Sequence, residues 1–386
     1  MICPSEVSGE ALLRFFATAS PIDLEVASEN PGWLTSLATV SPERVAQWWA
    51  ELRGPGSGAP DVYSPQQQVL LSSVPKVFGS LDGIPALDRV YANKLAAIEE
   101  ISQAESSLAA LRQNVSGNPM SYIDDELREL LAKEIAYLEK VVSGEVQLYL
   151  YDRRNSRIVE MIGTPGQDTQ RAITYIPGTF TGMKAFYDGG VQPFSRYLTR
   201  NNPGTVAFVY KDGVFPGENE RGGGEDFLRL DEANDPQIAL DAGRQLASFQ
   251  QGMRSDPLLA GTEQIGIGHS WGYANLSSSE VFGAEYDKSI SLSGAGMHEE
   301  WVADADTRYS NYVYGSDALL WAQKSGQVWD GNVPSTHDSF VNHEYSAPNN
   351  GSPLPDVTPI KDHSLIASDS QDNIEVLRDV NKEVMK

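Results

Sequence analysis

The chain has 386 residues, of which 40% are hydrophobic and 9% aromatic, and it carries a formal net charge of -24 at pH 7. This apolar content is enough for a large core and argues against a disordered chain, while the length favours one large domain with an added piece, or two domains. An acidic surface repels phosphate backbones and anionic membranes, so we expect no binding to nucleic acid.

The cysteine and histidine content argues against a metal site. The only cysteine is Cys3, and the five histidines show no metal-ligand spacing, so we expect no metal. We also expect no organic cofactor, because the serine chemistry inferred below needs none. The chain does not begin with a basic stretch followed by an apolar one, and it has no run of about eighteen apolar residues, so we expect neither a signal peptide nor a membrane span. These features predict a cytoplasmic protein.

The first part of the chain, residues 1–142, is expected to be helical. Apolar residues recur every three or four positions from 95 to 111 and again from 127 to 142, and the turn-forming sequence VSGNPMS separates the two stretches. This pattern predicts two long amphipathic helices that form an antiparallel hairpin over about 86–142. Such a hairpin fits a packing element of the main domain, a lid, or a surface for a second copy of the chain or another partner.

The remainder, residues 143–386, begins with the β-rich runs EVQLYLYDRR, RIVEMIG and AITYIPG and then alternates strand-like and helix-like segments. Such alternation predicts a mostly parallel sheet with helices on both faces. The close spacing of the first runs predicts an antiparallel meander at one edge of that sheet. We therefore expect an α/β domain after the helical N-terminal region.

The segment Gly268-His269-Ser270-Trp271-Gly272 is a G-x-S-x-G match between the strand-like QIGIG and the helix-like GYANLSSSEVF. In a nucleophile elbow the serine occupies a strained turn, where a side chain at either glycine would collide with a neighbouring strand or helix. This context predicts Ser270 as a nucleophile rather than an ordinary turn serine. The side chain of His269 should point away from the hydroxyl and be packed or hydrogen-bonded.

A serine nucleophile needs a base and an acid that orients the base, in the chain order serine, acid, histidine. Asp317 follows the β-rich run RYSNYVYG and fits the acid, although an aspartate at that position also commonly caps a helix. The alternatives Asp304 and Asp306 precede that strand. The expected base is His363, on a loop before the last helix, and His343 is its main rival.

Backbone N–H groups are expected to form an oxyanion hole beside the nucleophile. One donor is Trp271, which follows Ser270 at the positive end of a helix, and the other is Thr179 or Phe180, which follow the strand and turn TYIPG. The expected lining residues of the substrate pocket are Phe180, Trp271, Tyr273, Phe215 and His298.

Five stretches of the chain show a family resemblance together: WWAEL, PKVFGSLDGIPALDRVYANK, YIPGTFTG, GHSWG and DHSLIASDSQDNIEVLRDV. They resemble a group of α/β-hydrolases of unknown function common in actinobacteria, over about residue 48 to the C-terminus. The resemblance implies the α/β-hydrolase fold and the role of base for His363. The chain departs from that pattern after His363, where HSLI replaces an aromatic motif, and at Asp317, which lacks the usual following proline.

These features predict an esterase-like serine hydrolase that cleaves a small-molecule carboxylic ester through a Ser-His-Asp triad and an acyl-enzyme intermediate. The same triad fits an amidase or peptidase, or an acyltransferase, because G-x-S-x-G does not distinguish these reactions. A binding or scaffold protein on a hydrolase fold, with the helix hairpin as its working surface, is the remaining alternative.

Overall fold

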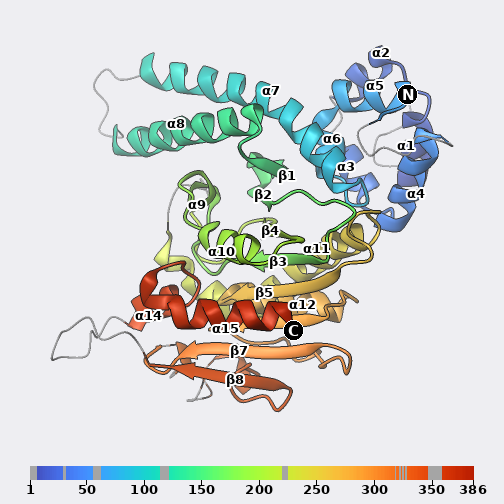
Figure 1. The fold of residues 1–386 in the computed structure, drawn as a ribbon. Helices are drawn as coiled ribbons and strands as arrows, with labels where there is room; N and C mark the ends of the chain where they lie inside the picture. Colours follow the sequence, from blue (N-terminus) through green and yellow to red (C-terminus); the bar gives the residue numbers. More distant parts are fainter. Residues whose placement is uncertain are drawn as a thin grey trace. The chain divides into compact units, whose positions relative to one another are not determined.

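The computed structural model describes residues 7–28, 32–54, 62–113, 121–219, 225–317, 319–320, 323, 326, 328–346 and 359–386 (Figure 1). The chain groups into two compact units. The first comprises Met1–Pro165 and Ser248–Gly261, and the second comprises Gly166–Ala247 and Thr262–Lys386. The boundary predicted near residue 142 lies inside the first unit.

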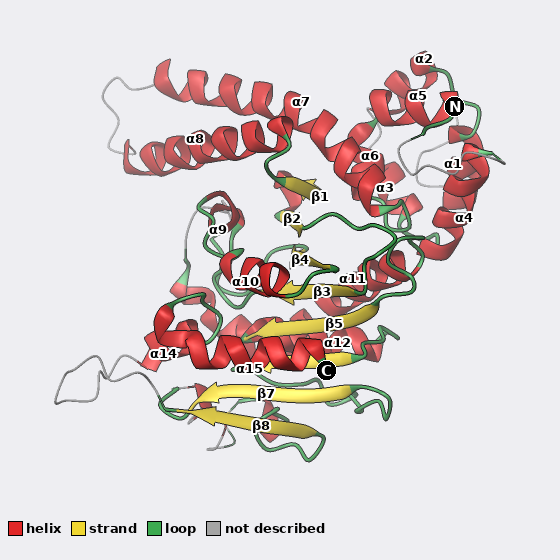
Figure 2. Ribbon diagram, viewed as in Figure 1, coloured by secondary structure: helices red, strands yellow, loops and turns green. Residues whose placement is uncertain are grey.

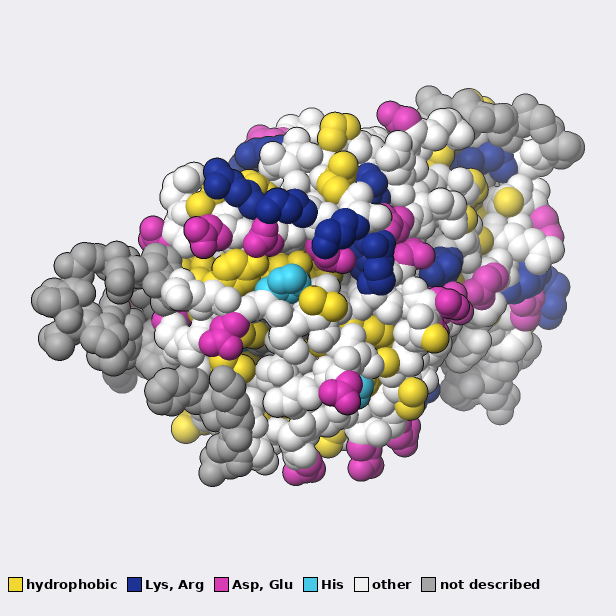
Figure 3. All heavy atoms as spheres, turned by 60° about the horizontal axis from the view of Figure 1, so that its bottom comes forward, with side chains coloured by type: hydrophobic (Ala, Val, Ile, Leu, Met, Phe, Trp, Pro, Cys, Tyr) yellow, Lys and Arg dark blue, Asp and Glu magenta, His cyan; other side chains and the backbone are white. Residues whose placement is uncertain are grey.

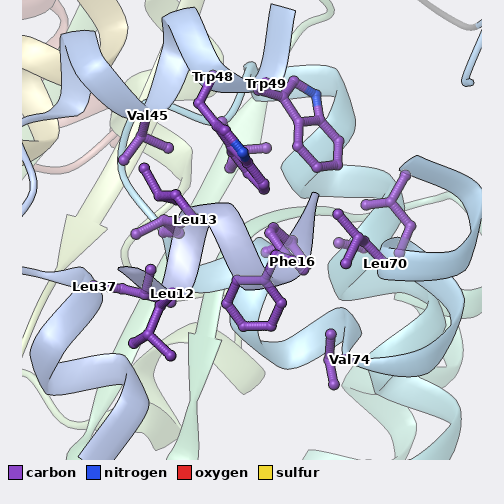
Figure 4. Packing of buried hydrophobic residues seen from close by; sticks show 14 of the residues in the cluster. Leu12, Leu13, Phe16, Leu37, Val45, Trp48, Trp49, Leu70 and Val74 are labelled. Atoms are coloured by element: carbon purple, nitrogen blue, oxygen red, sulfur yellow. The ribbon is translucent and has the colours of Figure 1, made fainter. Parts of the chain in front are cut away.

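The first unit begins with short helices, as the sequence predicts. Serines at positions 8, 41 and 64 cap three of them by accepting a backbone N–H, and prolines stand in the first turn of two of these three. Phe16, Trp48, Trp49 and Phe78 form the aromatic centre of their shared core (Figure 4). The helices are α1 (Gly9–Phe16), α2 (Pro21–Ser28), α3 (Gly32–Leu37), α4 (Pro42–Arg53), α5 (Pro65–Ser73) and α6 (Pro75–Ser80).

Two longer helices follow in the same unit, α7 (Ala86–Gln113) and α8 (Ser121–Ser143). They lie side by side along their length (Figure 1). The turn VSGNPMS predicted between them falls at residues 114–120, outside the described residues. A role of this helix pair as a lid or as a partner surface stays a prediction.

The LDGIPALDR stretch holds the first unit together through buried charges. The guanidinium of Arg89 is fully buried, lies 3.8 Å over the ring of Tyr149, donates to the carbonyl of Gly79 and pairs with Asp82 at 2.7 Å. Burial of an arginine is costly unless its donors find acceptors, and here Nε and Nη1 do. The stretch therefore has a structural role within this unit.

Two strands end the N-terminal part of the first unit, β1 (Gln147–Asp152) and β2 (Arg157–Ile162), and they pair antiparallel. The expected antiparallel meander is thus confirmed for these two runs and wrong for the third. The run AITYIPG forms β3 (Arg171–Ile176), which pairs parallel with β4 and β5. Its side chains are buried on both faces, which is typical of a strand in the centre of a parallel sheet.

The second unit contains a parallel sheet with the strand order β4-β3-β5-β6-β7-β8 (Figure 2). Helix α10 (Pro193–Asn201) and helix α15 (Ile374–Met385) cover one face, and helix α12 (Trp271–Val281) covers the other (Figure 1). This order, with parallel pairing and helices on both faces, is the α/β-hydrolase fold. The strands after β3 are β4 (Thr205–Lys211), β5 (Glu263–His269), β6 (Lys288–Leu292), β7 (Arg308–Tyr314) and β8 (Phe340–Tyr345).

The remaining helices connect these strands. Helix α11 (Pro236–Arg254) precedes β5 and matches the amphipathic segment predicted over 236–253. The others are α9 (Met183–Tyr187), α14 (Pro359–Leu365) and the short 3-10 helices η2 (Arg153–Asn155), η3 (Phe227–Asn234), η4 (Trp329–Gly331) and η5 (Gln371–Asn373).

The surface mixes charge types on the face drawn in Figure 3. Acidic and basic side chains are interspersed there, with apolar side chains between them. In the part of the chain that the structure describes, no helix combines the length and the apolar character needed to cross a membrane.

Candidate active site

Ser270 occupies a sharp turn between strand β5 and helix α12. Its φ of 54° and ψ of -126° lie in a region that residues other than glycine rarely adopt. Three backbone hydrogen bonds hold the turn: the N–H of Ser270 donates to Leu292 at 3.0 Å, and its carbonyl accepts from Tyr273 at 3.0 Å and Ala295 at 2.9 Å. Such strain persists only where the surroundings fix it, which is the geometry of a nucleophile elbow.

The glycines around Ser270 are required by close packing, as the sequence predicts. A Cβ on Gly268 would lie 2.5 Å from the Cα of Tyr273 in helix α12, and a Cβ on Gly272 would collide with the carbonyl oxygen of Ile176 at the end of β3. Both collisions involve backbone atoms, which cannot rotate away. A side chain at either position would therefore displace the serine.

Asp317 and His363 are joined by a hydrogen bond. Asp317 lies just after β7 and is fully buried, His363 lies in helix α14 rather than on the expected loop, and the distance from Asp317 Oδ2 to His363 Nδ1 is 2.9 Å. The other carboxylate oxygen, Oδ1, accepts the N–H of Leu319 at 2.8 Å. The capping interpretation and the catalytic interpretation of Asp317 therefore hold together, one for each oxygen.

The charge state of Asp317 fits an acid that orients a histidine. Burial opposes ionisation, but the hydrogen bond from His363 and the positive charge of that ring outweigh it, so the pKa of Asp317 lies below its usual value. The carboxylate is thus ionised at neutral pH and can stabilise an imidazolium. Because a carboxylate only accepts, Nδ1 of His363 carries the hydrogen and Nε2 is left as the basic nitrogen.

The rival residues lie elsewhere in the second unit. His343 is part of β8 and stacks on Tyr312 at 4.5 Å between ring centroids. Asp304 accepts the N–H of Asp306 at 2.7 Å in the turn before β7. The pairing seen in the structure is the one between Asp317 and His363.

His269 contacts the segment that carries His363, a role that the sequence did not reveal. Its Nε2 lies 2.9 Å from the carbonyl oxygen of His363, and the two rings lie 5.0 Å apart. A carbonyl only accepts, so Nε2 of His269 carries the hydrogen. Burial, and next the charge of His363, lower the pKa of His269 to about 3, so this imidazole is neutral in the working range of an enzyme.

Ser270 is connected to His363 through its sequence neighbour rather than directly. Among the described residues, the hydroxyl of Ser270 and the ring of His363 form no hydrogen bond with each other. Catalytic hydrogen bonds are often long in unliganded enzymes and shorten when substrate binds. The bond from His269 keeps His363 at the same end of the sheet as Ser270.

Of the three N–H groups expected to stabilise an oxyanion, one already donates to a carbonyl and two have no backbone acceptor. The N–H of Phe180 donates to the carbonyl of Pro216 at 2.8 Å, so the assignment of this N–H to the oxyanion hole is corrected. Within the described ranges, the N–H groups of Thr179 and Trp271 have no backbone acceptor. The turn that carries Thr179 lies against the nucleophile, because a Cβ on Gly178 would be 2.8 Å from the Cβ of Ser270.

Three of the expected pocket residues belong to the core instead. The side chains of Trp271, Tyr273 and Phe215 are each at most 1% exposed. Phe215 packs edge-on against Trp271 at 4.8 Å, and the hydroxyl of Tyr273 bonds that of Ser289 at 3.0 Å. These aromatic rings are core residues next to the Ser270 turn and offer no surface to a substrate.

The other two expected pocket residues differ in exposure. His298 is 6% exposed, and its Nδ1 accepts the N–H of Glu300 at 3.1 Å. Phe180 is half-buried and contacts Phe227 with 4.8 Å between ring centroids. Phe227 was not among the residues that the sequence singled out. Its position in the segment EDFLRL, an apolar pair within charged residues, was the only signal.

No metal centre is formed by the described side chains, since none of their groupings of histidine, cysteine and carboxylate could hold an ion. No family model matches the sequence, and no curated protein matches it.

Several solved structures are similar to part of the chain. One is a dienelactone hydrolase-like promiscuous phosphotriesterase from metagenomic libraries, with 14% identity, a TM-score of 0.35, and coverage of 59% of this chain and 92% of that chain. Another is dienelactone hydrolase from Anabaena variabilis, with 10% identity, a TM-score of 0.35 and coverage of 62% and 97%. A third is a carboxylesterase from Mesorhizobium loti, with 13% identity, a TM-score of 0.35 and coverage of 57% and 96%.

Proposed function

We propose that the protein is a serine hydrolase that cleaves a carboxylic ester, with Ser270 as nucleophile, His363 as base and Asp317 as the acid that orients it. The observation that carries this proposal is the strained backbone of Ser270 at the end of β5, together with the hydrogen bond that His363 donates to Asp317. The fold does not require a buried carboxylate to bond a histidine at the same end of the sheet as a strained serine. It fits the needs of nucleophilic catalysis.

The reaction follows from the atoms in place. Nε2 of His363 takes the proton of Ser270 as Oγ attacks the carbonyl carbon, and Asp317 stabilises the imidazolium that forms. The N–H groups of Trp271 and Thr179 and the positive end of helix α12 stabilise the oxyanion. His363 then returns the proton to the leaving alcohol, and water hydrolyses the acyl-enzyme by the same steps in reverse order.

A fluorophosphonate probe tests the nucleophile, because it reacts only with an activated serine. We expect one probe per chain by intact mass for the wild type, and none for Ser270→Ala. Ser143→Ala, which removes an exposed serine at the end of α8, is the matched control and should label like the wild type. An unlabelled wild type would refute the proposal and favour a scaffold on this fold.

A second measurement assigns the bond that is cleaved. Matched p-nitrophenyl esters and p-nitroanilides carry the same acyl group and differ only in the leaving atom. We expect turnover of the esters to exceed that of the anilides. Faster anilide turnover would assign an amidase to the same triad.

A further inference from the structure

The loop after β4 carries an exposed apolar surface. At the start of η3, Phe227 is 65% exposed, Leu228 92% and Leu230 49%. We call these three residues the apolar platform. Large apolar side chains gathered at one exposed place are unfavourable in water, and they commonly mark a binding site.

The platform adjoins the candidate active site. The ring of Phe227 lies against that of Phe180, with 4.8 Å between centroids. Phe180 follows two residues after Gly178, which packs on Ser270, and its N–H donates to the carbonyl of Pro216 at 2.8 Å. The turn beside the nucleophile and the loop that bears the platform are therefore bonded to each other.

Hydrogen bonds connect the described residues on either side of 220–224 in this loop, and a buried ion pair joins the loop to β4. The N–H of Asp226 donates to Gly217 at 2.7 Å, and the guanidinium of Arg229 donates to the carbonyl of Glu218 at 2.9 Å. The carboxylate of Glu218 in turn pairs with Lys211 at 2.7 Å, and both side chains are buried. A surface that is ordered before binding loses less entropy when a ligand arrives.

The charges around the platform select the ligand. Asp231, Glu232 and Asp235 lie within a few residues of it. Over the described residues 225–235 the sequence has one cationic side chain, Arg229, which pairs with Glu232 at 2.8 Å. An acidic rim repels an anionic ligand and leaves a neutral apolar one unaffected. The overall charge of -24 acts in the same direction.

We propose that the apolar platform binds the acyl chain of an uncharged ester while Ser270 attacks its carbonyl. This inference rests on the proposed function and adds the substrate class: neutral esters of medium-chain fatty acids. The chain would lie along Phe180 and Phe227 and end on Leu228 and Leu230.

The test compares p-nitrophenyl acetate with p-nitrophenyl octanoate. We expect the wild-type kcat/KM for octanoate to exceed that for acetate by about tenfold, because each added methylene that contacts an apolar surface strengthens binding. The double variant Leu228→Ser/Leu230→Ser should reduce this ratio to about twofold. The control is Val302→Ser, which removes an apolar side chain that is 81% exposed before β7, and it should keep the wild-type ratio.

A charged substrate tests the acidic rim. p-Nitrophenyl hemisuccinate has the same number of acyl carbons as the butyrate ester and adds one negative charge. We expect kcat/KM for hemisuccinate to be about tenfold or more below that for butyrate, and the gap to narrow as salt is added. Equal rates for the two esters would contradict a platform that selects neutral chains.

The outcomes separate the two proposals. If the wild type labels with fluorophosphonate and hydrolyses acetate, but the octanoate ratio is the same in the double variant, the platform proposal is wrong and the proposed function stands. If the wild type neither labels nor hydrolyses any ester, both the proposed function and this inference are wrong. A dimer seen by light scattering that the double variant dissociates, with the ratio unchanged, would show that a second copy covers the platform.

Discussion

Asp317→Asn separates the two roles of one buried carboxylate. Oδ1 of Asp317 accepts the N–H of Leu319 and Oδ2 accepts the Nδ1–H of His363. In the asparagine variant the remaining oxygen can still cap Leu319, and the new amide then points its N–H groups toward His363. That imidazole must present a lone pair at Nδ1 and carry its hydrogen on Nε2, where it can no longer take a proton from Ser270.

The expected loss in kcat is about ten thousandfold, or about 5 kcal/mol in activation free energy, which is the size of the effect of the same change in other Ser-His-Asp triads. The loss in stability should be smaller. A charge-assisted hydrogen bond is replaced by a neutral one, which costs about 1–2 kcal/mol, while the cap is retained. Asp317→Ala also loses the cap and should be less stable than Asp317→Asn by about 1 kcal/mol, with a similar kcat.

The assay pairs ester hydrolysis with urea unfolding of the same samples. Asp304→Asn changes the rival acid in the turn before β7 and should leave kcat within about twofold of the wild type. The pH dependence follows from the sign of the shift: the pKa of Asp317 is lowered in the folded state, so its contribution to stability is present above the usual pKa of aspartate and is lost as pH falls through the folded value. A kcat for Asp317→Asn within tenfold of the wild type would refute its assignment as the catalytic acid.

Three further changes test other parts of the second unit. Burial raises the pKa of Glu280 to about 7 from 4.5, so the stability that this carboxyl contributes is present below pH 4.5 and is lost as pH rises through 7. The free energy of unfolding of Glu280→Gln, measured in urea, should therefore exceed that of the wild type by about 2 kcal/mol at about pH 8 and by little at about pH 4. An equal gain at both pH values would contradict this. Gly272→Ala should abolish probe labelling and lower stability by about 2–3 kcal/mol, whereas Gly261→Ala, where a Cβ meets nothing within 4 Å, should do neither. His269→Ala should lower kcat by about tenfold to a hundredfold with little change in KM, and His269→Gln, whose amide can still donate to the carbonyl of His363, should recover most of it; equal losses in both would show that the hydrogen bond is not what matters.

The parts of the site that the sequence predicted are those that depend on local geometry. Gly268 and Gly272 flank Ser270 because of collisions with atoms of the adjoining strand and helix, so the pattern of small residues is visible in five consecutive letters. Asp317 was found for a related reason. Its position directly after a strand and before a helix is a local signal, and both of its roles follow from that position.

The parts that the sequence did not predict depend on contacts between distant segments. His269 and His363 are separated by 94 positions, and no local pattern indicates that one donates to the backbone of the other. The N–H of Phe180 was assigned to the oxyanion hole because nothing in its own segment shows that Pro216 accepts it. The sequence around an aromatic residue near Ser270, such as Tyr273, does not indicate whether its side chain lines a pocket or lies in the core.

Two of the contacts that assemble the site are made by residues that adjoin Ser270 and Thr179 in the chain. His269, the residue before Ser270, donates a hydrogen bond to the segment that carries His363. The residue after Thr179 donates to the loop that follows β4, and so leaves the N–H of Thr179 available. In the proposed reaction the hydroxyl of Ser270 gives its proton to His363 and the N–H of Thr179 stabilises the oxyanion. A structural hydrogen bond from either group to another acceptor would have to break in each turnover, and its cost would be added to the activation barrier. Because these two hydrogen bonds are made one residue away, they fix the geometry of the site and leave the hydroxyl of Ser270 and the N–H of Thr179 available for the reaction.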